Sequence, residues 1–184
     1  MARTPTTQIP LGFQAPDFNL PDVSDGSFKT LNDLKGEKVT LVAFICNHCP
    51  FVIHVIEKLS EVIAKKQSED VGFILISSND VVNYPDDSPE KMKLFREKYN
   101  IGVPYLYDES QEVAKAYDAA CTPDFSVFDT DLKCVYRGQM DNSRPGNDLP
   151  NDAADLLKVI EYVENGKEID FPQLPSIGCN IKWK

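Results

Sequence analysis

Two cysteines lie three positions apart in the stretch FICNHCPFV, residues 44–52. A thiol reacts as its thiolate, and two thiols separated by two residues can meet across one helical turn. Cys46 and Cys49 could therefore form and break a disulfide. Together with His48 they could instead hold a metal ion, or they could be two buried thiols that are close by chance.

The segments on either side of the pair predict a strand that leads into a helix. Residues 37–45 form an apolar, β-branched run typical of a buried strand, and apolar residues recur with helical spacing over 50–68. A helix N-terminus favours an anion. We therefore expect the sulfur of Cys46 to face this N-terminus and to attack a substrate disulfide, while Cys49 resolves the mixed disulfide. As an imidazolium, His48 would stabilise the thiolate further.

A second candidate region is CTPDFSVFD, residues 121–129. Thr122-Pro123 comes just before a predicted strand, where a redox fold would place a cis-proline. A proline there would leave the backbone of Thr122 free to pair with an extended substrate, and Asn47 is expected on the same substrate-binding side. The alternative is an ordinary trans-proline at a strand edge.

The remaining pattern predicts one α/β domain over residues 1–184, with a mixed sheet that has helices on both faces. Residues 1–36 are expected to form an N-terminal hairpin extension, and residues 167–184 an irregular tail. The other predicted elements are strands at 71–77 and 104–108, helices at 88–100, 109–119 and 152–166, and a hairpin over 125–139.

The order of the predicted elements resembles the thioredoxin fold. It runs from a strand through CNHCP to a long helix and a buried strand, and then through TP to a hairpin and a final helix. The N-terminal hairpin and the inserted helix and strand between residues 79 and 118 resemble its redoxin branch. That branch includes the thiol reductases of cytochrome maturation and the alkyl hydroperoxide reductase/thiol-specific antioxidant group. The resemblance implies a thiol–disulfide oxidoreductase with a redox-active Cys46–Cys49 disulfide. It implies no organic cofactor and no metal, a protein or small-molecule disulfide as substrate, and an upstream thiol as electron donor.

The sequence departs from the peroxiredoxin pattern Pro-x-x-x-Thr-x-x-Cys. With Cys49 aligned as the peroxidatic sulfur, Val42 replaces the proline and Cys46 replaces the threonine. The arginine that this family places near the Thr-Pro position is also missing. A dedicated peroxidase is therefore not expected, but thiol-dependent peroxide reduction through the CxxC pair is an alternative function.

Two further cysteines are candidates for a third thiol. Cys121 lies two residues before Pro123, and Cys179 lies in the tail, from which it could fold back; both could equally be packed and inert. A non-enzymatic metal site would combine Cys46, His48 and Cys49 with one of them.

Composition narrows the classes of partner. The chain has 184 residues and a formal net charge of −10, from 19 basic and 29 acidic residues. That balance argues against nucleic acid and anionic membranes as partners. Without an apolar run of ~20 residues or a signal-like N-terminal segment, the chain is expected to be cytoplasmic.

Overall fold

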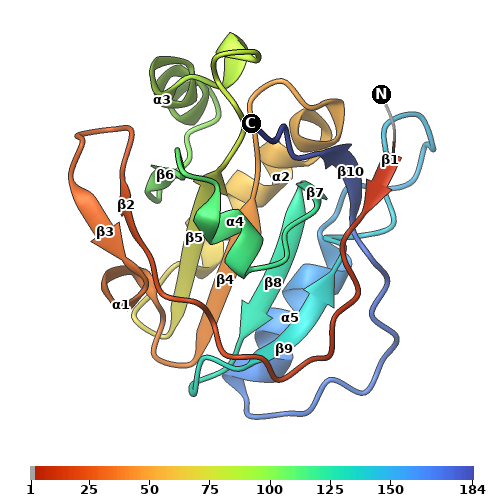
Figure 1. The fold of residues 1–184 in the computed structure, drawn as a ribbon. Helices are drawn as coiled ribbons and strands as arrows, with labels where there is room; N and C mark the ends of the chain where they lie inside the picture. Colours follow the sequence, from red (N-terminus) through yellow and green to blue (C-terminus); the bar gives the residue numbers. More distant parts are fainter. Residues whose placement is uncertain (1–2) are drawn as a thin grey trace.

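The centre of the computed structural model, which describes residues 3–184, is a five-stranded sheet in the order β6-β5-β4-β8-β9 (Figure 1). Its strands are β4 (Val39–Phe44), β5 (Val71–Ser77), β6 (Tyr105–Tyr107), β8 (Asp124–Phe128) and β9 (Cys134–Gly138). The first three are parallel, and β8 and β9 run antiparallel to their neighbours. The predicted mixed sheet is confirmed.

Helices cover both faces of this sheet, as predicted. The helices α2 (Pro50–Lys66), α3 (Pro89–Lys98) and α5 (Ala154–Glu164) lie behind it in Figure 1, and α4 (Glu112–Ala116) lies in front. Strand β4 is buried on both sides. Leu41 and Ala43 join the core under α2 and α5, whereas Val42 and Phe44 join the core under α4. Burial on both faces explains why this segment is continuously apolar rather than alternating.

The N-terminal hairpin is also confirmed, and residues 1–2 of the predicted extension lie outside the described residues. Strands β2 (Asn19–Pro21) and β3 (Phe28–Thr30) pair antiparallel, and the short helix α1 (Leu31–Leu34) follows with a capping box between Thr30 and Asp33. Asp22 forms an isolated bridge with Leu106, so the connection between β2 and β3 lies against the β6 edge of the main sheet.

The prediction of an irregular tail over 167–184 is wrong for part of that segment. Strand β10 (Ile177–Asn180) lies between β1 (Arg3–Pro5) and β7 (Cys121–Thr122) in a three-stranded antiparallel sheet. The sequence IGCN is too short to show alternation, and its partners come from distant parts of the chain. In Figure 1, β1 and β10 lie side by side, and β10 lies next to α2.

Strand β10 is held in place by close contacts on both sides. A Cβ atom on Gly178 would lie 2.0 Å from the backbone oxygen of Thr122, so only glycine permits this approach. Beyond the strand, Asn79 accepts a hydrogen bond from the backbone N–H of Lys182, and the Gln111 side chain donates to the Lys182 carbonyl. The tail is therefore an ordered part of the fold.

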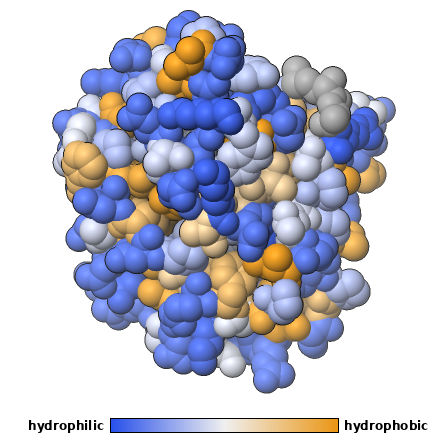
Figure 2. Space-filling view, viewed as in Figure 1, coloured by the Kyte–Doolittle hydropathy of each residue, from blue (hydrophilic) through white to orange (hydrophobic). Residues whose placement is uncertain are grey.

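The face of the molecule shown in Figure 2 is largely polar. On the face shown in Figure 2, apolar residues form small groups among hydrophilic ones. Within residues 3–184, no helix is long and apolar enough to cross a membrane.

Candidate active site

The two cysteines of the CxxC motif lie where β4 leads into α2, as predicted. Cys46 follows the strand, and Cys49 is the N-cap residue directly before Pro50, the first residue of the helix. Both are reduced, and their exposed fractions are 1% and 0%. The N-cap position thus belongs to Cys49, not to Cys46, which was expected to face the start of the helix.

Thr122 brings the second predicted region against the pair. The Thr122-Pro123 peptide bond is cis, as predicted. The Thr122 hydroxyl lies 3.2 Å from the sulfur of Cys46, and the Thr122 carbonyl accepts a hydrogen bond from the Cys49 thiol, also at 3.2 Å. The CxxC motif and the Thr-Pro motif therefore form one site.

The backbone of Thr122 is not open to a substrate in this structure, contrary to expectation. Thr122 is buried, and it pairs with Cys179 of strand β10 in antiparallel register. The tail therefore occupies the position where an extended substrate was expected to bind.

This pairing brings a third sulfur into the site. The Cys179 sulfur lies 2.8 Å from the Cys49 sulfur, within hydrogen-bond distance, although the two residues are 130 positions apart in sequence. Cys179 is as deeply buried as Cys46. The sequence raised Cys179 as a possible third thiol, but nothing in the tail indicated which cysteine it would meet.

The surroundings of the sulfurs favour a negative charge on Cys49. Donation from the Cys46 thiol, helped by the Cys179 thiol, lowers the pKa of Cys49 to about 5. The shared proton, burial and the nearby Asp87 carboxylate raise the pKa of Cys46 well above its usual value. Burial and the charge on Cys49 raise the pKa of Cys179 to about 12. Of the three sulfurs, Cys49 is therefore the one whose surroundings favour the thiolate, whereas those of Cys46 and Cys179 favour the thiol.

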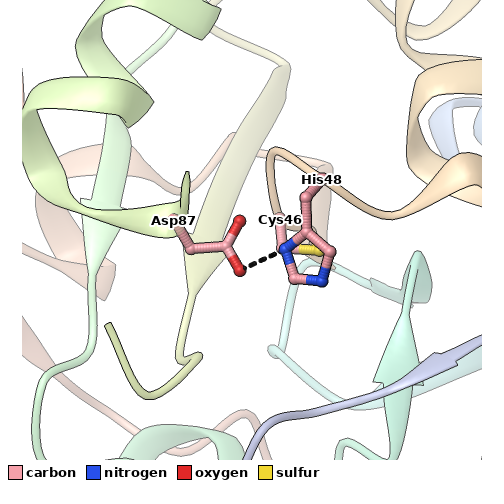
Figure 3. A group of neighbouring side chains, drawn as sticks. All are labelled: Cys46, His48 and Asp87. Carbon is pink, nitrogen blue, oxygen red and sulfur yellow. Dashed lines mark ion pairs between the residues drawn. The ribbon is translucent and has the colours of Figure 1, made fainter. Parts of the chain in front are cut away.

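A histidine and a buried carboxylate flank the pair on the side of Cys46 (Figure 3). Nδ1 of His48 lies 2.7 Å from a carboxylate oxygen of Asp87, and the imidazole ring stacks on Tyr84. The Cys46 sulfur, a ring nitrogen of His48 and an Asp87 oxygen all lie within 4.8 Å of one another. His48 is thus beside the pair, as predicted, but its nearest charge is Asp87.

Asp87 is a site residue that the sequence analysis missed. It lies in the 3₁₀ turn η1 (Pro85–Asp87) and is fully buried. Its carboxylate accepts hydrogen bonds from the backbone N–H of Asn47 and from the side chain of Asn79. It therefore holds the loop between the two cysteines. Its sequence context resembles an ordinary helix start, so no local signal indicates this role.

Asn47 and Cys121 make structural contacts in this arrangement. The Asn47 amide donates to the backbone of Asp86 at 2.9 Å. The Cys121 thiol donates to the Pro123 carbonyl at 3.5 Å and lies 3.9 Å from the hydroxyl of Thr6. Burial raises the pKa of Cys121, which disfavours its thiolate.

The donor set for a metal differs from the expected one. Within residues 3–184, the potential ligand atoms of Cys46, His48 and Asp87 lie close enough together to hold a metal ion. Cys49 is not part of this group; its sulfur contacts that of Cys179 in β10. Sulfur, imidazole and carboxylate donors suit zinc. Nδ1 of His48, one of its two possible ligand atoms, is however already in short contact with the Asp87 carboxylate.

Comparison with known proteins places this site in a family. The family model described as Redoxin matches residues 10–157. A solved structure of a conserved protein from Geobacillus kaustophilus is 50% identical, with a TM-score of 0.97 over 100% of this chain and 97% of that one. A Mycobacterium tuberculosis protein named "Putative peroxiredoxin" is 29% identical over 120 residues, 63% of this chain and 68% of that protein.

A more distant structure identifies the fold. The thioredoxin domain of a thiol-disulfide oxidoreductase from Bacteroides vulgatus is 21% identical, with a TM-score of 0.60 over 85% of this chain and 99% of that one. The likeness shows a shared thioredoxin-like fold, with a mixed central sheet flanked by helices. With the family model matching most of its length, this chain belongs to the redoxin family.

Proposed function

We propose that this protein is a thiol–disulfide oxidoreductase whose redox pair is Cys46 and Cys49. The observation that supports this most directly is that both sulfurs lie at a strand-to-helix junction, each 3.2 Å from an oxygen of Thr122 beside the cis-proline. A thiolate of the pair attacks one sulfur of a substrate disulfide and releases the other as a thiolate. The second thiol of the pair then attacks the mixed disulfide, which yields reduced substrate and a Cys46–Cys49 disulfide.

The charge distribution favours Cys49 as the attacking sulfur. Its pKa of about 5 makes it the thiolate at neutral pH, whereas Cys46 keeps its proton. We therefore reverse the roles expected from the sequence, so that Cys49 attacks and Cys46 resolves. Nδ1 of His48 lies 2.7 Å from Asp87, so as an imidazolium His48 would offset the carboxylate charge that disfavours a Cys46 thiolate when Cys46 resolves.

The proposal requires no organic cofactor and no metal. Electrons leave through the substrate disulfide and return when an upstream thiol reduces the Cys46–Cys49 disulfide. A polypeptide substrate would bind beside Pro123 and Asn47 and would displace β10 from Thr122, since β10 occupies that edge.

Peroxide reduction is the second candidate function. Cys49 combines a low pKa with complete burial, so a small oxidant reaches it more easily than a protein does. The thiolate would attack the peroxide O–O bond, forming a sulfenic acid and releasing water or an alcohol. The Cys46 thiol would then condense with the sulfenic acid, releasing water and forming the same disulfide. The name of the M. tuberculosis relative also supports this candidate.

Trapping of mixed disulfides tests the redox pair and the order of attack. The Cys179 sulfur touches Cys49, so the experiment uses a Cys179→Ser background, in which Cys46→Ser, Cys49→Ser and Cys134→Ser are compared. Cys134 is buried in β9 and provides the matched control. After incubation with oxidised glutathione, mass spectrometry should show a glutathione adduct on Cys49 in the Cys46→Ser chain. The Cys134→Ser chain should form the Cys46–Cys49 disulfide.

Other outcomes contradict specific parts of the proposal. An adduct on Cys46 in the Cys49→Ser chain, with none on Cys49 in the Cys46→Ser chain, would restore Cys46 as the attacking sulfur. If neither chain forms an adduct and no Cys46–Cys49 disulfide appears, the redox function fails. Purification with bound zinc and thiols that resist alkylation would then support the non-enzymatic metal site.

A further inference from the structure

Strand β10 lies outside the part of the chain that the family model matches. The match ends at residue 157, whereas β10 spans Ile177–Asn180. This strand nevertheless contributes a buried sulfur to the active site. The function of that sulfur does not follow from membership in the redoxin family.

The position of the Cys179 sulfur is set by the backbone around it. Cys179 lies opposite Thr122 in the register of β10 and β7, and Thr122 itself contacts both cysteines of the pair. The close approach of Gly178 to the Thr122 carbonyl brings the two strands together. As a result, the Cys179 sulfur lies 2.8 Å from the sulfur of Cys49.

We propose that Cys179 is a third redox-active thiol, which takes over the disulfide from the Cys46–Cys49 pair. This inference rests on the proposed function. The Cys179 thiolate attacks the sulfur of Cys49, the Cys49–Cys179 bond forms, and the Cys46–Cys49 bond breaks. Cys46 leaves as a thiolate and takes up the proton that Cys179 has lost. No external oxidant is consumed, because one disulfide replaces another.

The exchange has two consequences for the site. It regenerates the Cys46 thiol, and it ties β10 covalently to the start of α2. A Cys49–Cys179 disulfide would therefore hold the tail over Thr122, whereas the Cys46–Cys49 disulfide leaves β10 attached only by noncovalent contacts. In this oxidised form, the Cys49–Cys179 disulfide would keep β10 paired with Thr122, at the edge where substrate is expected to bind.

Tryptic peptides separate the two disulfides cleanly. Cys46 and Cys49 lie in the same peptide, residues 39–58, and Cys179 lies in residues 168–182. A Cys46–Cys49 disulfide therefore stays within one peptide, whereas a Cys49–Cys179 disulfide links two. The full-length protein is incubated with oxidised glutathione, its free thiols are alkylated, and the non-reduced digest is analysed by mass spectrometry over time.

In the wild-type chain, we expect the internal disulfide of residues 39–58 first, followed by linked peptides in which Cys46 is alkylated. The Cys46→Ser chain should form the linked peptides directly, and the Cys179→Ser chain should stop at the internal disulfide. Cys134→Ser is the control and should match the wild type. Cys46→Ala serves as a second variant if serine disturbs folding at this buried position.

The failures of the two proposals are distinguishable. Absence of the linked peptides in both the wild-type and Cys46→Ser chains, with the internal disulfide present, overturns the role of Cys179 and leaves the proposed function intact. Absence of both disulfides in every chain overturns the proposed function as well.

Discussion

At the scale of single residues, the site is organised around the sulfur of Cys49. Hydrogen bonds from the Cys46 thiol, the Cys179 thiol and the backbone of Val52 lower the pKa of this sulfur. A sulfur that receives donors at a helix N-terminus is stabilised as an anion even when it is buried, because these interactions offset the loss of hydration. The same contacts leave the two donor thiols protonated. One charge is therefore localised on the sulfur that both potential partners can reach.

The charge on Cys49 predicts a pH titration that can be observed directly. Ultraviolet absorbance of the thiolate should rise with a midpoint near pH 5 in the wild-type protein and in the Cys134→Ser control. That step should be absent in Cys49→Ser. In Cys179→Ala the midpoint should move upward, since one donor to Cys49 is lost. A wild-type protein with no thiolate below pH 7 would contradict this assignment of the charge.

At the scale of elements, the sequence predicted those helices and strands whose formation depends on residues close together in the chain. The helix predicted over 50–68 is observed over 50–66, and the strand at 71–77 is observed over the same residues. Both depend on the spacing of apolar residues over several turns or positions. Strand β10 was missed because two-residue and three-residue pairings with distant strands leave no periodic signal in the sequence.

The same distinction holds for the candidate site. The CxxC motif and the Thr122-Pro123 motif were identified because each carries its signal within a few residues. Asp87 and Cys179 reach the site through η1 and β10, and their places depend on how the chain folds around the sheet. The chemistry of each cysteine was visible in the sequence, whereas the distribution of charge among them required the three-dimensional contacts.

Substitution of Gly178 tests the importance of β10. An alanine Cβ would lie 2.0 Å from the Thr122 carbonyl, so Gly178→Ala should force β10 away from β7. Overpacking of this kind costs about 1–3 kcal/mol of unfolding free energy. Chemical denaturation should show this loss, and Cys49 should be alkylated faster. Gly102→Ala is the matched control, because a Cβ there meets nothing within 4 Å. Identical stability and alkylation in the two variants would contradict the close approach of the strands.

At the scale of the whole molecule, a buried charge pair connects β8 and β9 to the loop before the active site. The guanidinium of Arg137 donates to the carbonyls of Tyr117 and Asp118, and lies 3.7 Å from the carboxylate of Asp124. Asp124 in turn accepts a hydrogen bond from the backbone of Ala120. These contacts fix the segment that leads into Thr122. Removal from water is costly for both charges, and their attraction offsets only part of that cost.

The balance within this pair predicts how stability changes with pH. Burial outweighs the attraction of Arg137 and raises the pKa of Asp124 from 3.8 to about 6. The folded state therefore holds this proton more tightly than the unfolded chain does. The resulting stabilisation is present below pH 4 and is lost as the pH rises through 6, which amounts to roughly 3 kcal/mol.

Urea denaturation at pH 4 and pH 7 can isolate this contribution. Asp124→Asn removes the titrating group, so between the two pH values the wild-type protein should lose roughly 2 kcal/mol relative to the variant, most of the full effect. The exposed Asp131→Asn substitution, in the hairpin between β8 and β9, should leave the wild-type profile unchanged. The comparison uses the difference between profiles because other carboxylates titrate over the same range. Parallel profiles for wild type and Asp124→Asn would mean that Arg137 keeps Asp124 ionised throughout, and that attraction rather than burial controls the pair.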